Sequence, residues 1–393
     1  GLDGSLAELY AMVDGLDGQV GRLLDAVDSL GIGDDTVILF LSDNGPWVGT
    51  NTLTEEEHRV RYVSGMRGHK GDIWENGVRS PLFVRWRGRL EPRLVTRATD
   101  VTDLLPTLRD LAGVQTPSAR PLDGRSMVPS LEGDDEALAA RPIYRYAHPG
   151  WISGDTPWTP EGLPGEYAPV DKDALEFERQ ALALREGRYK LLQNPLATDH
   201  EGEPGEPHLV LVDLAEDPGE RANLAEEQPE RVAALQAELR RWWEDILAEE
   251  TSFQPAVFPV GLEGRASTRI KACAPRAVSG GLVNSFMYVT GWRVGGRAEY
   301  LLDVRTPGEH EVAAEFAGAP PRDATFGVAA SGVSTDETPA AGRSLRIDAE
   351  GTQTPALVTL PKGPVVLSVE LGGASDVAAA ASARLSAVRL ERR

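Results

Sequence analysis

The hydrophobic periodicity of this chain changes once, between about residues 250 and 262, and that change limits the possible folds most. Before it, apolar side chains recur at helical spacing in three segments, which are residues 5–30, 100–113 and 226–249. After it, apolar and polar residues alternate, as from Tyr300 to Val304. The pattern predicts an α/β part followed by a sandwich of antiparallel strands.

The first predicted helix leads into an apolar strand with polar residues at its end. Residues 36–41 are β-branched and apolar without alternation, which favours a strand covered on both faces, as in a parallel α/β sheet. Asp43 and Asn44 follow within the tetrapeptide Ser-Asp-Asn-Gly, and ligands bind where such strands end. Their oxygens are hard donors that suit Ca²⁺ or Mg²⁺. A plain turn explains the same tetrapeptide, because Asn-Gly is a common turn pair.

A second segment, residues 65–81, concentrates glycine and positive charge. Lys70 lies in Arg-Gly-His-Lys-Gly, and the neighbouring glycines allow the backbone to approach a ligand closely. An ammonium group there can face an anion, although a solvated basic loop gives the same pattern. Residues 81–86 then predict a second short strand.

The charge of the whole chain excludes some classes of partner. Lys and Arg number 40 against 61 Asp and Glu, which gives a net charge of −21. So acidic a protein is a poor partner for nucleic acid or an anionic membrane. A single cysteine, Cys273, excludes an intrachain disulfide.

Seven segments, in order, resemble the second half of the formylglycine-dependent, arylsulfatase-like sulfatases over about residues 5–247. They are VGRLLDAVDSLG, TVILFLSDNG, GMRGHKGDIWENGVRSPLFVRW, DLLPTLRDLAGV, LDGRSMVPSLEG, LREGRYKLL and LVDLAEDPGERANLAEEQPE. The resemblance implies an α/β fold with part of an alkaline-phosphatase-like core and a small antiparallel subdomain, followed by the β-sandwich. We expect the core in residues 1–180, the subdomain in 181–255 and the sandwich in 258–393.

The resemblance also implies an activity and roles for individual residues. Asp43 and Asn44 resemble two metal ligands, normally for Ca²⁺ and less often for Mg²⁺, and Lys70 resembles the lysine that contacts the sulfate ester. Arg79 resembles a structural residue. The implied reaction is hydrolysis of a sulfate ester on a small molecule or carbohydrate, and the implied location is periplasmic or secreted. The trailing sandwich resembles one found in some bacterial sulfatases.

The family's nucleophile motif, Cys or Ser followed by x-Pro-x-Arg, has no match in this sequence. Cys273-Ala-Pro-Arg is one residue short of it and lies in the β-rich region, so we interpret Cys273 as a packed cysteine. We therefore expect the formylglycine and half of the metal ligands to come from a preceding segment. On that expectation, residues 1–393 alone are inactive and poorly soluble.

Other interpretations remain open at this stage. A phosphodiesterase or phosphonate hydrolase of the same superfamily often has Ser-Asp-His-Gly where this chain has Asn44, and a non-catalytic carbohydrate-binding fragment is a third possibility. His148 and Trp151 either line a substrate pocket or are structural. Trp292 and Tyr300 either stack on sugar rings or belong to the core of the sandwich, and the alternation favours the core.

Overall fold

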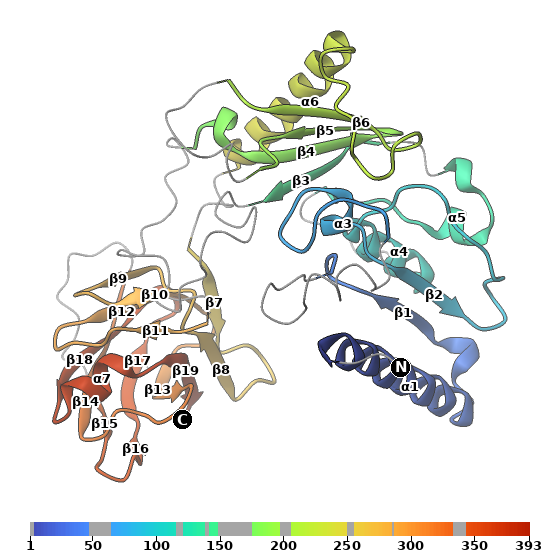
Figure 1. The fold of residues 1–393 in the computed structure, drawn as a ribbon. Coiled ribbons are helices and arrows are strands. Elements are labelled where there is room, and N and C mark those ends of the chain that lie inside the picture. The colour runs from blue at the N-terminus through green and yellow to red at the C-terminus, as the bar shows by residue number, and fades with distance from the viewer. Residues whose placement is uncertain are drawn as a thin grey trace. The chain divides into compact units, whose positions relative to one another are not determined.

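The computed structural model describes residues 4–46, 64–114, 121–137, 141–147, 175–196, 206–249, 255–284, 287–332 and 343–393. The chain divides into two compact units (Figure 1): Gly1–Thr156 with Glu176–Asp245, and Pro157–Leu175 with Ile246–Arg393. No helix among the described residues is long and apolar enough to span a membrane.

The first unit contains the predicted helices and strands in the predicted order. Its helices are α1 (Gly4–Ser29), α3 (Glu75–Val78), α4 (Leu104–Leu111), α5 (Val128–Glu132) and α6 (Pro229–Ala248). Its strands are β1 (Val37–Leu41), β2 (Leu82–Trp86), β3 (Ile143–Ala147), β4 (Ala181–Glu186), β5 (Tyr189–Gln193) and β6 (Leu209–Asp213). The sequence pattern did not predict strand β3 or helix α5, and the predicted subdomain boundary at residue 180 stays a prediction.

Two sequence predictions about the start of this unit are wrong. Strand β1 pairs antiparallel with β2, from Val37 opposite Trp86 to Leu41 opposite Leu82, instead of lying in a parallel sheet. The apolar stripe of α1 is also largely exposed, with Leu16 and Leu23 each more than half accessible. Among the described residues, β2 is the only strand that pairs with β1. Most apolar side chains of α1 likewise have little to pack against, and so they stay exposed.

The four-stranded antiparallel sheet β3-β4-β5-β6 is the centre of the first unit. Alternation along each strand gives it two buried faces. One face packs on α6, whose Val232, Leu235 and Leu239 are buried, and Tyr144 of β3 stacks on Trp242 with ring centroids 4.7 Å apart. The opposite face packs on Ile73 and Trp74. This second contact places the segment just before α3 directly on the sheet.

The second unit is a sandwich of two β-sheets, as the alternation predicted. Its strands are β7 (Val257–Val260), β8 (Ser267–Lys271), β9 (Ala277–Ser279), β10 (Val283–Asn284), β11 (Val289–Thr290), β12 (Arg297–Val304), β13 (Gly308–Phe316), β14 (Ala324–Gly332), β15 (Arg343–Ile347), β16 (Gln353–Thr354), β17 (Ala356–Leu360), β18 (Gly363–Ala374) and β19 (Leu385–Arg392). One sheet has six strands and the other seven, and the helix α7 (Val377–Ser382) is shorter than two turns.

The interior of the sandwich contains the alternating apolar residues. Every second residue of β12 from Ala298 to Val304 is buried. Trp292 and Tyr300 are fully buried, and Trp292 contacts Phe326 edge-on with ring centroids 5.3 Å apart. The core interpretation of these two aromatic residues is therefore confirmed, and neither is available to stack on a sugar.

Candidate functional site

Strand β1 ends at Leu41, and a tight turn follows it at once. The Ser42 hydroxyl donates a hydrogen bond to the Asn44 carbonyl at 3.0 Å, and the Asn44 amide Nδ2 donates to the Gly45 carbonyl at 2.9 Å. The second bond engages the nitrogen of the Asn44 side chain and leaves its Oδ1 oxygen as an acceptor. Asp43 is exposed, and its carboxylate has no hydrogen-bond or ion-pair partner among the described residues. Two consecutive residues with oxygen donors thus follow the end of the strand.

The loop that carries Lys70 is held by its own backbone and by Asn76. Gly68 has a left-handed φ of +87°, and a Cβ there would lie 2.6 Å from the Trp74 Cβ, so this position requires glycine. The His69 amide donates to Asp72 Oδ2 at 2.9 Å, and Asn76 Nδ2 donates to the Gly68 carbonyl at 2.8 Å. The loop is therefore fixed on both sides of Lys70.

Two backbone hydrogen bonds join the turn after β1 to the Lys70 loop. The Gly45 amide donates to the Gly77 carbonyl at 2.9 Å, and the Lys70 amide donates to the Pro46 carbonyl at 2.9 Å. The segments that carry Asp43, Asn44 and Lys70 are consequently adjacent, although they are separated in sequence. The Lys70 side chain is exposed and has no ion-pair partner among the described residues. The chemical roles of all three residues stay predictions.

The arrangement fits part of a cation site. No group of three or more His, Cys, Asp or Glu side chains within the described ranges is placed to hold a metal ion. Asp43 and Asn44 alone offer hard oxygen donors of the kind that Ca²⁺ takes, but Ca²⁺ binds about six to eight oxygens. These two residues therefore account for a minority of a calcium coordination sphere.

A buried charge cluster beside this loop was missed by the sequence reasoning. Lys190 of β5 contacts Glu75 Oε1 at 3.0 Å and Glu220 Oε1 at 2.9 Å, and Arg185 of β4 contacts Glu75 Oε2 at 3.3 Å. Lys190 is 2% exposed and Glu220 1%. One feature of the sequence could have indicated this cluster, namely Lys190 within the mostly apolar strand Tyr189–Gln193. A lysine is almost never buried unless it is paired with an opposite charge.

The two carboxylates of the cluster have opposite pKa shifts. Burial acts to raise the pKa of Glu75, but the nearby charges of Lys190 and Arg185 outweigh it and hold that pKa below its ordinary value. Burial raises the pKa of Glu220 above its ordinary value. The charge of Lys190 lowers that pKa only in part, because Lys190 also pairs with Glu75. Glu75 is thus the more firmly ionised of the two.

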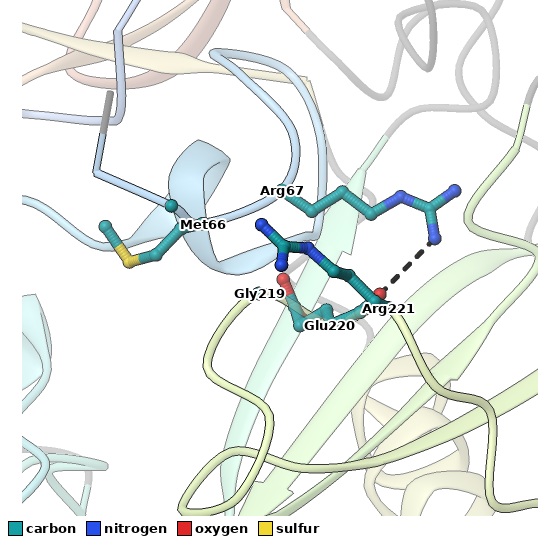
Figure 2. Close-up of a pocket in the computed structure, with 6 residues that line it drawn as sticks. Met66, Arg67, Gly219, Glu220 and Arg221 are labelled. Carbon is teal, nitrogen blue, oxygen red and sulfur yellow. Dashed lines mark hydrogen bonds between the residues drawn. The ribbon is translucent and has the colours of Figure 1, made fainter. Parts of the chain in front are cut away.

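A shallow hollow of about 450 Å³ adjoins the Lys70 loop, between residues 65–67 and 219–221. Figure 2 shows Arg67 donating to the Glu220 carbonyl across one side of it, with a separation of 3.5 Å. The Arg67 guanidinium also lies 3.8 Å from the centre of the Trp74 ring. The exposed Arg67 and Arg221 give the rim of this hollow positive charge inside an acidic protein.

Of the remaining candidates from the sequence, the structure describes Arg79 and Cys273. Arg79 follows α3, and its amide donates to the Glu75 carbonyl at 2.7 Å, while its structural role stays a prediction. Cys273 lies in the second unit as a partly buried free thiol. His148 and Trp151 fall outside the described residues.

This chain is similar in sequence to known sulfatases. Residues 4–114 match the family model described as Sulfatase. The chain is 32% identical over 226 residues to steryl-sulfatase of Mus musculus, with 56% of this chain and 34% of that protein covered. It is 32% identical over 239 residues to arylsulfatase A of Bos taurus, with 56% of this chain and 40% of that protein covered.

The chain is therefore similar to sulfatases, and it spans 34% to 40% of the length of these two relatives. Among solved structures, a Bacteroides thetaiotaomicron protein of glycosaminoglycan metabolism is similar, with a TM-score of 0.44 and 22% identity. That likeness covers 60% of this chain and 43% of the other. It is a likeness of backbone and says nothing about substrate.

Proposed function

We propose that the complete protein carrying this chain hydrolyses sulfate esters, R–O–SO₃⁻, to an alcohol and sulfate. The observation that carries the proposal is the pair of backbone hydrogen bonds joining the Asp43–Asn44 turn to the Lys70 loop. They bring the backbone of Lys70 next to the turn that carries Asp43 and Asn44. A lysine and two oxygen donors are the combination that a sulfate bound through a cation needs. The match of residues 4–114 to the Sulfatase family model and the similarity to steryl-sulfatase support the same chemistry.

Lys70 stabilises negative charge on the ester in this proposal. A sulfate ester is an anion and this chain has a net charge of −21, so the long-range field opposes binding. Lys70 has no ion-pair partner among the described residues, so no neighbouring carboxylate of those residues competes with the sulfate for its ammonium group. As the S–O bond breaks, negative charge grows on the departing oxygen, and an ammonium group fixed nearby lowers the energy of that transition state.

Asp43 and Asn44 hold part of a calcium site in the proposal. Their oxygens fit Ca²⁺ as donors, and Asn44 is already oriented by its bond to the Gly45 carbonyl. When bound, the ion neutralises charge on the sulfate oxygens and orients the nucleophile. The nucleophile expected from the family is a formylglycine, for which the residues of this chain offer no motif.

The alcohol released is a carbohydrate or another small molecule, and Arg67 and Arg221 beside the Lys70 loop favour a substrate with additional negative charge. The hydrolysis of phosphonate esters is the competing activity. Asn44 favours the sulfatase, because hydrolases of the competing class commonly have histidine at that position.

The test is the turnover of 4-nitrophenyl sulfate by the complete protein with Ca²⁺, in wild type and in Lys70→Ala. We expect Lys70→Ala to lower kcat/KM by about 10²–10³-fold, the usual loss for one charge-stabilising group. Lys362→Ala is the matched control, because Lys362 is an exposed lysine of the second unit. Unchanged turnover in Lys70→Ala, or faster hydrolysis of a phenyl phosphonate ester than of the sulfate, would overturn the proposal.

A further inference from the structure

The backbone at Glu220 is in a conformation that its residue type does not favour. Its φ is +52°, in the left-handed region where glycine and asparagine are the usual residues. The preceding residue is Gly219, and the turn is closed by the Glu220 amide donating to the Asp217 carbonyl at 3.1 Å. A non-glycine residue persists in such a conformation when its surroundings require it. Contacts of the Glu220 side chain are therefore expected to offset the cost of this backbone conformation.

That side chain makes two contacts with the interior. One carboxylate oxygen accepts from Lys190 Nζ at 2.9 Å, and the other accepts from the Glu75 backbone amide at 2.6 Å. The Glu75 amide is at the start of α3 and has no partner within that helix. Glu220 thus fixes the first residue of α3, and Lys190 fixes the side chain of the same residue from β5.

Helix α3 in turn holds both loops of the candidate site. The Asn76 amide donates to the Arg67 carbonyl at 2.8 Å, and its side chain donates to Gly68. The Gly77 carbonyl accepts from Gly45. A shift of Glu75 would therefore move the supports of Lys70 and of the Asp43–Asn44 turn together.

We propose that Glu220 is a positioning residue, which acts through Lys190 and Glu75 to hold the loop that presents Lys70. The proposal rests on the function proposed above. It assigns a supporting role to the turn between β6 and α6, because this turn carries Glu220. A loop displaced by about 1 Å can cost on the order of 10²-fold in rate.

Four variants of the complete protein separate positioning from general stability. Glu220→Gly relieves the left-handed backbone but removes the carboxylate, whereas Glu220→Gln keeps an acceptor for the Glu75 amide. Leu239→Ala is the stability control, because Leu239 is fully buried against the opposite face of the same sheet. Lys190→Met with Glu220→Gln is a second probe, in which Glu75 keeps Arg185 and no buried charge is left unpaired.

The measurement is the steady-state turnover of 4-nitrophenyl sulfate well below each variant's melting temperature. We expect kcat to fall about 10- to 100-fold in Glu220→Gly and in the double variant, with KM changing by less than about 3-fold. Glu220→Gln and Leu239→Ala keep kcat near the wild-type value. In a Lys70→Ala background, Glu220→Gly adds a smaller further loss than in the Lys70 background, because the part of its effect that acts through Lys70 is already absent.

Three outcomes would overturn the proposal. Equal losses of kcat in the Lys70 and Lys70→Ala backgrounds would show that Glu220 does not act through Lys70. The same loss in Leu239→Ala would show an effect of stability alone. Wild-type kcat in the double variant would show that the cluster is dispensable. An inactive wild type overturns the proposed function as well, whereas an active wild type with any of these results overturns the positioning role alone.

Discussion

Gly45 connects the two loops of the candidate site because it has no side chain. A Cβ at this position would collide with the carbonyl oxygen of Asn76, and its own amide donates to Gly77. Backbone atoms in such a contact cannot move aside as the end of a flexible side chain can. The close approach of the Asp43–Asn44 turn to the Lys70 loop therefore depends on glycine here.

Gly45→Ala is predicted to lower the free energy of unfolding by roughly 2–4 kcal/mol, as expected for a clash within a packed region. Gly21→Ala is the matched control, because a Cβ there meets nothing within 4 Å and the position lies inside α1. That control should raise stability by about 0.5–1 kcal/mol. Urea unfolding of both variants measures the difference, and a Gly45→Ala protein as stable as wild type would contradict the contact.

At the residue scale, the sequence predicted what lies in local motifs and missed what is assembled across the fold. Asp43, Asn44 and Lys70 each lie in a short segment whose residue types indicate anion or cation chemistry. Glu75 and Lys190 are 115 positions apart, and Lys190 and Glu220 are 30 apart. No periodicity connects residues at such separations, so their pairing emerged only from the packing of α3 on the sheet.

Among the helices, α4 shows most clearly how its start is fixed. Asp100 precedes a short 3₁₀ turn, Val101–Asp103, that leads into α4. Its carboxylate accepts from the Thr102 amide at 3.0 Å, and the Asp103 carboxylate accepts from the Asp100 amide at 2.8 Å. Arg145 of β3 contacts the other Asp100 oxygen at 2.6 Å. The reciprocal bonds between Asp100 and residues 102–103 cap the start of the helix, and the contact with Arg145 joins that start to the edge strand β3 of the four-stranded sheet.

Asp100→Asn is predicted to lower stability by about 1 kcal/mol at pH 7 by removing a charge-assisted bond while keeping the cap. Burial acts to raise the pKa of Asp100, but the hydrogen bonds from Thr102 and the charge of Arg145 outweigh it, so the pKa is lowered. A lowered folded-state pKa contributes stability above the unfolded-state pKa and loses it as pH falls through the folded-state value. Thermal unfolding between pH 7 and pH 2 should therefore show the two proteins converging, and a constant difference would contradict this.

At the scale of elements, helices were predictable where apolar residues recur at helical spacing over a long segment, and short strands were less predictable. The expected helix over residues 226–249 is α6, within three residues at either end. Strand β3 was missed because its five residues follow a stretch rich in proline, glycine and acidic residues, and only pairing with β4 defines it. The partner of β1 could not be predicted, since an apolar strand does not specify which neighbour it pairs with.

In the whole molecule, the β-sandwich has its own interior. Its core cluster draws buried residues from Val260 to Leu390 and includes none from the first unit. A domain with a separate core of this kind can fold alone. We predict that residues 255–393 unfold in one cooperative transition by circular dichroism.

Trp292→Ala should lower the free energy of unfolding of these residues by about 3–5 kcal/mol, because Trp292 is fully buried. A soluble product without such a transition would contradict the prediction.

In the proposed function, Asp43, Asn44 and Lys70 act together on one sulfate group in the complete protein. The most direct measurement is a crystal structure of that protein grown with Ca²⁺ and sulfate. We predict a calcium ion bound by the Asp43 carboxylate and Asn44 Oδ1, with Lys70 Nζ roughly 3 Å from an oxygen of a sulfate that shares the ion. A calcium ion bound elsewhere, or a sulfate at this site with Lys70 turned away from it, would contradict the account.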